Sequence, residues 1–112
     1  MKNLNCSMAI IASIFALQFS WAQPGNYTVE AGAFYFAPTE LTIEVGSTVT
    51  WTNVGGLHNI NFDTNTITGN NFDNPESFSV PPVYSAGPNS PVEIGSWTFN
   101  VEGSYTYDCS VG

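Results

Sequence analysis

One stretch of the sequence decides the fold, and it reads Leu41-Thr42-Ile43-Glu44-Val45-Gly46-Ser47-Thr48-Val49-Thr50-Trp51-Thr52-Asn53. Apolar and polar residues alternate on both sides of Gly46-Ser47, and this period of two is typical of strands that bury one face. Glycine and serine favour a turn where the two halves meet. The stretch therefore predicts two β-strands joined by a turn, with Val49 and Trp51 facing a core.

Alternating runs recur on both sides of this stretch, separated by turn signals that contain glycine or proline. The runs are Tyr27–Glu30, Ala33–Pro38, His58–Phe62, Gly95–Val101 and Ser104–Cys109. In the last run Tyr105, Tyr107 and Cys109 share one face, because successive side chains of a strand point to opposite faces. Several short strands of this kind predict an all-β sandwich or barrel.

The span from Asp63 to Pro91 lacks this periodicity and is rich in Asn, Thr, Gly, Pro and Ser. These residue types favour turns, and repeated prolines disfavour a long helix. One short strand, Ser77–Val80, is expected within the span. A loop of this length inside a small domain is more often functional than an empty linker.

The N-terminal 22 residues predict a secretory signal peptide. Lys2 supplies a positive start, Met8 to Phe19 form an apolar run, and Ser20-Trp21-Ala22 offers small residues at the two positions a signal peptidase reads. The apolar run is too short to span a membrane, which takes about 20 residues, and no transmembrane segment follows. We therefore expect residues 1–22 to be removed, residues 23–112 to form one domain, and the protein to be exported to a periplasmic or extracellular space.

The charged side chains of the expected domain are all acidic. The sequence has nine acidic residues and a single basic one, Lys2, which lies in the predicted signal. Nucleic acid is an excluded partner, and anionic lipid is disfavoured, because binding to phosphate depends on Lys and Arg. An acidic surface attracts a basic partner at low salt, and it also serves plain solubility.

His58 is the only histidine, and Cys109 is the only cysteine outside the predicted signal. An exported lone cysteine has three interpretations: an intermolecular disulfide, an inert buried thiol, or a metal ligand. Both residues lie where a predicted strand gives way to a loop. A thiolate and an imidazole at one end of a sandwich suggest a soft transition-metal site, with copper the first candidate.

The order and spacing of several fragments resemble the plastocyanin/azurin family of type 1 copper proteins, the cupredoxins. The fragments are Phe36-Ala37-Pro38, Leu41 to Asn53, His58-Asn59, Trp97-Thr98-Phe99 and Gly103 to Cys109. The resemblance covers most of the expected domain, from about Tyr27 to Gly112. It implies an eight-stranded Greek-key β-sandwich that holds one copper at its end.

The resemblance also implies roles for individual residues. His58 matches the family's first histidine ligand, and Cys109 matches the cysteine ligand. Asn59 matches the asparagine whose side chain ties the two ligand loops together by hydrogen bonds. The family's second histidine and axial methionine follow the cysteine by a few residues, so they are expected beyond Gly112. The expected fold is accordingly a cupredoxin-like sandwich missing its last strand, which would leave an unpaired edge.

The leading functional hypothesis is an exported blue-copper protein that carries single electrons through one Cu(II)/Cu(I) site. It would not be an enzyme, and its partner would be a redox protein with a basic surface, such as a c-type cytochrome. Two alternatives stay open. One is a metal-free recognition module that uses the 63–94 loop, and the other is one domain of a multicopper oxidase or reductase. A histidine followed by a methionine downstream of Gly112 would favour the carrier.

Overall fold

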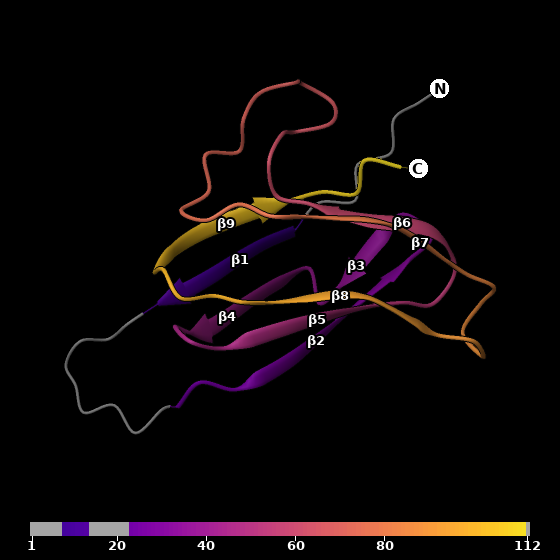
Figure 1. Cartoon of the computed structure of the whole chain (residues 1–112), viewed down its shortest axis with the longest axis horizontal. Coiled ribbons are helices and arrows are strands. Elements are labelled where there is room, and N and C mark those ends of the chain that lie inside the picture. Colours follow the sequence, from indigo (N-terminus) through magenta and orange to yellow (C-terminus); the bar gives the residue numbers. More distant parts are fainter. Residues whose placement is uncertain (1–7, 14–22, 112) are drawn as a thin grey trace.

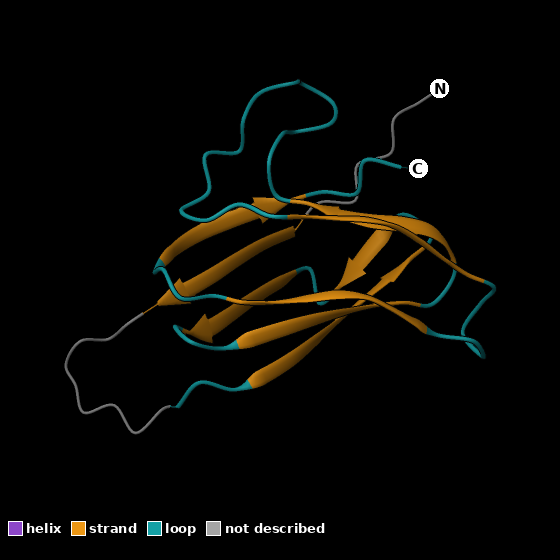
Figure 2. Cartoon of the chain, in the orientation of Figure 1, coloured by secondary structure: helices purple, strands orange, loops and turns teal. Residues whose placement is uncertain are grey.

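The structure, a computed structural model, describes residues 8–13 and 23–111 and consists of strands and loops in these ranges (Figures 1 and 2). The strands are β1 (Met8–Ser13), β2 (Asn26–Gly32), β3 (Tyr35–Ala37), β4 (Glu40–Glu44), β5 (Thr48–Asn53), β6 (Gly56–Asn61), β7 (Ser79–Ser85), β8 (Val92–Thr98) and β9 (Gly103–Tyr107). The predicted all-β class is confirmed. No helix that could cross a membrane occurs among the described residues.

The strands form three hydrogen-bonded groups. The largest has the order β3-β2-β5-β8, the second has the order β4-β1-β9, and β6 pairs with β7. Figure 1 shows β1 and β9 side by side along one side of the molecule, with β2, β5 and β8 along the other. This arrangement is consistent with the predicted cupredoxin-like sandwich.

The core between the sheets is mainly aromatic. Val49 and Trp51 of β5 are fully buried, as the alternation predicts. The Trp51 ring meets the Tyr107 ring edge-on at a centroid distance of 5.6 Å, and Trp51 Nε1 donates a hydrogen bond of 2.9 Å to the Tyr107 hydroxyl. Phe62 stacks on Tyr107 at 4.7 Å. These rings join β5 to β9 and fix the strand that leads to Cys109.

Burial raises the pKa of the core tyrosines further above neutral pH. Removal from water raises the pKa of Tyr107 far above its usual value, and the hydrogen bond from Trp51 opposes this only in part. Burial and the negative charge of Glu76 raise the pKa of Tyr105 to about 12. The protonated Tyr105 hydroxyl donates to the Val101 carbonyl oxygen at 2.5 Å. Both tyrosines act as hydrogen-bonding core residues, and they stay protonated well into the alkaline range.

The prediction for residues 63–91 needs correction, because this span contains β7, which begins two residues after the predicted Ser77 start and continues to Ser85. Pro81 and Pro82 lie inside it, although proline cannot donate to a ladder. In the part of the chain that the structure describes, β7 pairs only with β6, and the register of this pair shifts between His58 and Ile60 of β6. An edge strand with a bulge tolerates proline. Strand β8 also begins earlier than predicted, at Val92.

The expected unpaired edge at the last visible strand is not bare. Strand β1, which lies in the apolar run of the predicted signal peptide, pairs antiparallel with β9 and parallel with β4. The rest of that predicted signal, residues 1–7 and 14–22, lies outside the described residues. The division into a signal peptide (1–22) and a domain (23–112) stays a prediction.

Candidate metal centre

His58 and Cys109 meet at one end of the sandwich. His58 lies in β6, and Cys109 follows the end of β9. An antiparallel bridge between Asn61 and Asp108 aligns the two segments, with reciprocal backbone hydrogen bonds of 2.9 and 3.0 Å. As a result Cys109 Sγ lies 3.6 Å from His58 Nδ1. Cys109 is 1% exposed and His58 is 6% exposed. The structure therefore brings these two predicted ligands together in a buried place.

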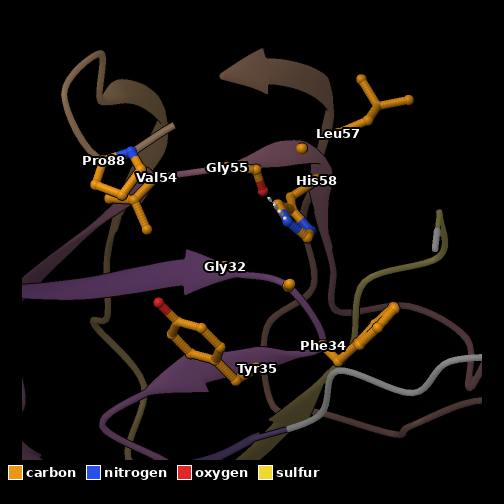
Figure 3. A pocket seen from close by; sticks show the side chains of 10 residues that line it. Gly32, Phe34, Tyr35, Val54, Gly55, Leu57, His58 and Pro88 are labelled. Carbon is orange, nitrogen blue, oxygen red and sulfur yellow. Dashed lines mark hydrogen bonds between the residues drawn. The ribbon is translucent and has the colours of Figure 1, made fainter. Parts of the chain in front are cut away.

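The backbone around His58 fixes its tautomer. His58 Nε2 lies 2.7 Å from the carbonyl oxygen of Gly55, which the dashed line in Figure 3 marks. A carbonyl oxygen can only accept, so Nε2 carries the proton and donates it. Nδ1 therefore presents its lone pair on the side of the Cys109 sulfur. A neutral imidazole held by a hydrogen bond from its other nitrogen is the usual form of a metal-ligating histidine.

The turn that holds His58 depends on Asn53, a residue that the sequence reading did not single out. The Asn53 side chain donates to the carbonyl oxygens of Gly56 and Val83, each at 2.8 Å, and accepts from the backbone N–H of Gly55 at 2.8 Å. Gly56 has φ of +87°, a conformation that favours glycine. The buried amide thus positions the carbonyl that orients the imidazole. The position of Asn53 at the end of an alternating strand gave no indication of this role in the sequence.

Asn59 connects the histidine strand to the cysteine loop. Its Oδ1 accepts from the backbone N–H of Ser110 at 2.7 Å, and its Nδ2 donates to Ser110 Oγ at 2.8 Å. Both bonds cross between segments that are 51 positions apart in the chain. The side chain of Asn59 thus links the two segments, and its role at a copper site stays a prediction.

Asp108 holds the other side of the cysteine loop and was also missed by the sequence reading. Its fully buried carboxylate accepts from Asn61 Nδ2 at 2.9 Å, from the Thr66 backbone N–H at 2.8 Å and from Thr66 Oγ1 at 3.0 Å. The Cys109 thiol itself lies 2.8 Å from the carbonyl oxygen of Val111. Contacts on both sides of Cys109 therefore restrict where its sulfur can lie.

A pocket of about 480 Å3 opens beside His58 (Figure 3). Its lining is largely apolar and includes Phe34, Tyr35, Leu57 and Pro88. Phe34 is 65% exposed and Leu57 is 47% exposed. His58 itself lines the pocket, and the exposed apolar side chains of Phe34 and Leu57 border it.

The donor chemistry fits copper, but the described residues do not complete a site. A thiol sulfur and an imidazole nitrogen are the soft and borderline donors of type 1 copper centres. Their burial also makes the intermolecular-disulfide interpretation of Cys109 unfavourable, because another protein's thiol could not reach the sulfur. No group of three or more His, Cys, Asp or Glu side chains suited to a metal exists within residues 8–13 and 23–111.

Replacing Asn59 by alanine is expected to loosen the Cys109 loop. The variant loses two hydrogen bonds at a largely buried position, so the free energy of unfolding should fall by about 1–2 kcal/mol. Cys109 should also react faster with a thiol reagent, measured in a Cys6→Ser background. The matched control is Ser110→Ala, which removes one of the two bonds and keeps the backbone bond to Asn59 Oδ1. Equal effects of the two variants would contradict the bridging role of Asn59.

Comparisons with known proteins agree with these features. Residues 24–111 match the model of a family described as copper-binding proteins of the plastocyanin/azurin family. The chain is 37% identical to a plastocyanin of Scenedesmus fuscus over 81 residues, which cover 71% of this chain and 76% of the relative. It is 35% identical to a chloroplastic plastocyanin of Tetradesmus obliquus over 108 residues, which cover 91% of this chain and 70% of the relative. No solved structure matches the chain significantly.

The matches decide several of the predictions made from the sequence. The predicted resemblance and copper as the cofactor are confirmed, and the plastocyanins that the chain resembles are electron carriers rather than enzymes. Residues 24–111 include the whole region in which His58, Asn59 and Cys109 come together. The chain belongs to the plastocyanin/azurin family of copper-binding proteins.

Proposed function

We propose that this protein carries single electrons and that His58 Nδ1 and Cys109 Sγ are two of its copper ligands. A second histidine and an axial methionine, supplied from outside the described residues, would complete the site. The observation that carries the proposal is the 3.6 Å approach of the two buried donor atoms, with the imidazole lone pair on the side of the sulfur. When bound, copper supplies a one-electron couple between Cu(II) and Cu(I).

The surrounding residues favour rapid electron transfer because they restrict movement of the donors. Asn53 accepts a hydrogen bond from the N–H of Gly55, the residue whose carbonyl orients the imidazole, and Asn59 ties the imidazole's strand to the cysteine loop. Asp108 anchors that loop on its other side. A donor set that keeps one geometry needs little rearrangement when an electron arrives or leaves. This chain's residues thus hold the ligands, while the metal provides the redox change.

The proposed partner is a redox protein with a basic surface, such as a c-type cytochrome. Residues 23–112 contain no Lys or Arg, which favours encounter with a positively charged surface. The apolar rim at Phe34 and Leu57 lies next to the His58 pocket, so a partner packed there would approach the imidazole closely. We further propose export to the periplasm or the extracellular space, on the basis of the signal-like residues 1–22.

The test uses the reading frame extended past Gly112. The purified protein, loaded with Cu(II), is expected to show intense visible absorption from thiolate-to-copper charge transfer. Titration with a reductant should bleach the band with one electron per protein. A colourless protein that binds no copper, or binds it away from His58 and Cys109, would favour the metal-free recognition module. Additional histidine-rich motifs with oxidase activity would favour a multicopper enzyme.

A further inference from the structure

Asp108 is a buried carboxylate directly beside Cys109. Its side chain is fully buried, just past the end of β9. Both of its carboxylate oxygens accept from N–H groups, Oδ1 from Asn61 Nδ2 at 2.9 Å and Oδ2 from the Thr66 backbone at 2.8 Å. The Thr66 hydroxyl also donates to Oδ1, at 3.0 Å. Accepting from every partner is the pattern of an ionised carboxylate.

No cationic side chain neutralises this charge within the part of the chain that the structure describes. Residues 8–13 and 23–111 contain neither Lys nor Arg. His58, the single histidine of the sequence, is neutral when its Nδ1 lone pair binds a metal. The three hydrogen bonds to Asp108 come from uncharged groups, which weaken its negative field without cancelling it.

The charge of Asp108 also lies close to the sulfur of Cys109. Neighbouring Cα atoms are about 3.8 Å apart, so the carboxylate and the sulfur are separated by at most about 10 Å. The bridge between Asn61 and Asp108 keeps this segment extended, and alternation sends the side chains of Asp108 and Cys109 to opposite faces. The carboxylate therefore acts through space and not as a ligand. Because it is buried, salt screens it much less than a surface charge.

We propose that Asp108 lowers the reduction potential of the copper site by favouring Cu(II) over Cu(I). The inference rests on the proposed function, in which Cys109 is a copper ligand. In the step concerned, a donor gives up one electron and is oxidised, and Cu(II) becomes Cu(I). The site loses one positive charge, and a fixed negative charge nearby makes this loss less favourable. Asp108 thereby makes the reduced protein a stronger electron donor to its partner.

The first test replaces Asp108 by asparagine in the protein extended past Gly112 and loaded with copper. The fraction of blue protein in mixtures of ferrocyanide and ferricyanide gives the equilibrium constant for the reduction of Cu(II) by ferrocyanide. Loss of the buried charge is expected to raise this constant about tenfold. Asp73→Asn is the matched control, because Asp73 is exposed and asparagine tolerates its φ of +58°. The control should leave the constant unchanged, since water and salt screen an exposed charge.

The second test keeps the charge and removes one of its hydrogen bonds. Thr66→Val deletes the hydroxyl that donates to Oδ1, so the negative field of the carboxylate becomes stronger. The equilibrium constant is therefore expected to fall, by about twofold. A loosened cysteine loop would move the constant of Asp108→Asn and Thr66→Val in the same direction, whereas a charge effect moves them in opposite directions. Thr66→Val also decides the question if Asp108→Asn does not fold.

The outcomes separate this inference from the proposed function. A blue natural protein whose constant stays the same in both variants, or rises in Thr66→Val, would overturn the role of Asp108 and leave the proposed function intact. A natural protein that binds no copper at Cys109 would refute the proposed function and, with it, the role of Asp108.

Discussion

Replacing Cys109 by serine is expected to abolish the visible charge-transfer band of the copper-loaded, extended protein. The band requires a sulfur donor, and a serine hydroxyl is a harder ligand that stays protonated at neutral pH. Cys109 is the only cysteine within residues 8–13 and 23–111, and its buried sulfur faces the lone pair of His58 Nδ1 at 3.6 Å. Absorption spectra of copper-loaded samples, with metal content measured in parallel, provide the readout.

The fold should survive this substitution, because serine is slightly smaller than cysteine and keeps the backbone bond between Ser110 and Asn59. Far-ultraviolet circular dichroism of the metal-free protein tests this point. Ser110→Ala is a suitable control, since it changes the neighbouring residue and leaves the sulfur in place. A serine variant that retains the full band would show that the thiol of Cys109 is not a copper ligand.

Replacing Trp51 by alanine is expected to lower the free energy of unfolding by about 3–5 kcal/mol. The Trp51 side chain is completely buried and packs against three aromatic rings, those of Phe62, Phe78 and Tyr107. Its loss leaves a cavity between β5 and β9, and the Tyr107 hydroxyl loses the donor at 2.9 Å. Urea denaturation followed by circular dichroism measures the change.

Two variants separate the causes of this effect. Trp51→Phe retains most of the ring and removes the hydrogen bond, so it should cost only part of the alanine effect. Trp97→Ala removes a ring that stacks on Phe78 at 4.4 Å but is only half-buried, and it should cost clearly less than Trp51→Ala. If Trp97→Ala were as destabilising as Trp51→Ala, burial between the sheets would not be the reason for the large effect expected at Trp51.

The sequence allowed the class of the fold to be predicted because alternation is a local property. The pleat of a strand sends successive side chains to opposite faces, so Val49 and Trp51 could be assigned to the core before any partner strand was known. The same reasoning failed at β7, where Pro81 and Pro82 obscured the pattern. Those prolines are tolerated because β7, among the described strands, pairs with β6 alone and does so in a shifted register. Neither condition can be read from the segment itself.

Some residues of the candidate site could likewise be predicted from the sequence, and others could not. His58 and Cys109 stood out in the sequence because each is the only residue of its chemical type outside the predicted signal. Asn59 was found through the family resemblance. Asn53 and Asp108 were not found, because an asparagine or aspartate at the end of a strand is ordinary. Their importance lies in burial and in bonds to segments that are distant in the chain.

What the sequence by itself determined was therefore the strand class, the two candidate donors and the family that they resemble. Only the tertiary structure decided that Sγ and Nδ1 lie 3.6 Å apart, that Nε2 carries the proton, and that Asn59 bonds to Ser110. The physical reason is the range of the interactions. Side-chain alternation follows from the geometry of one strand, whereas these contacts exist only after segments far apart in sequence have closed around a common core.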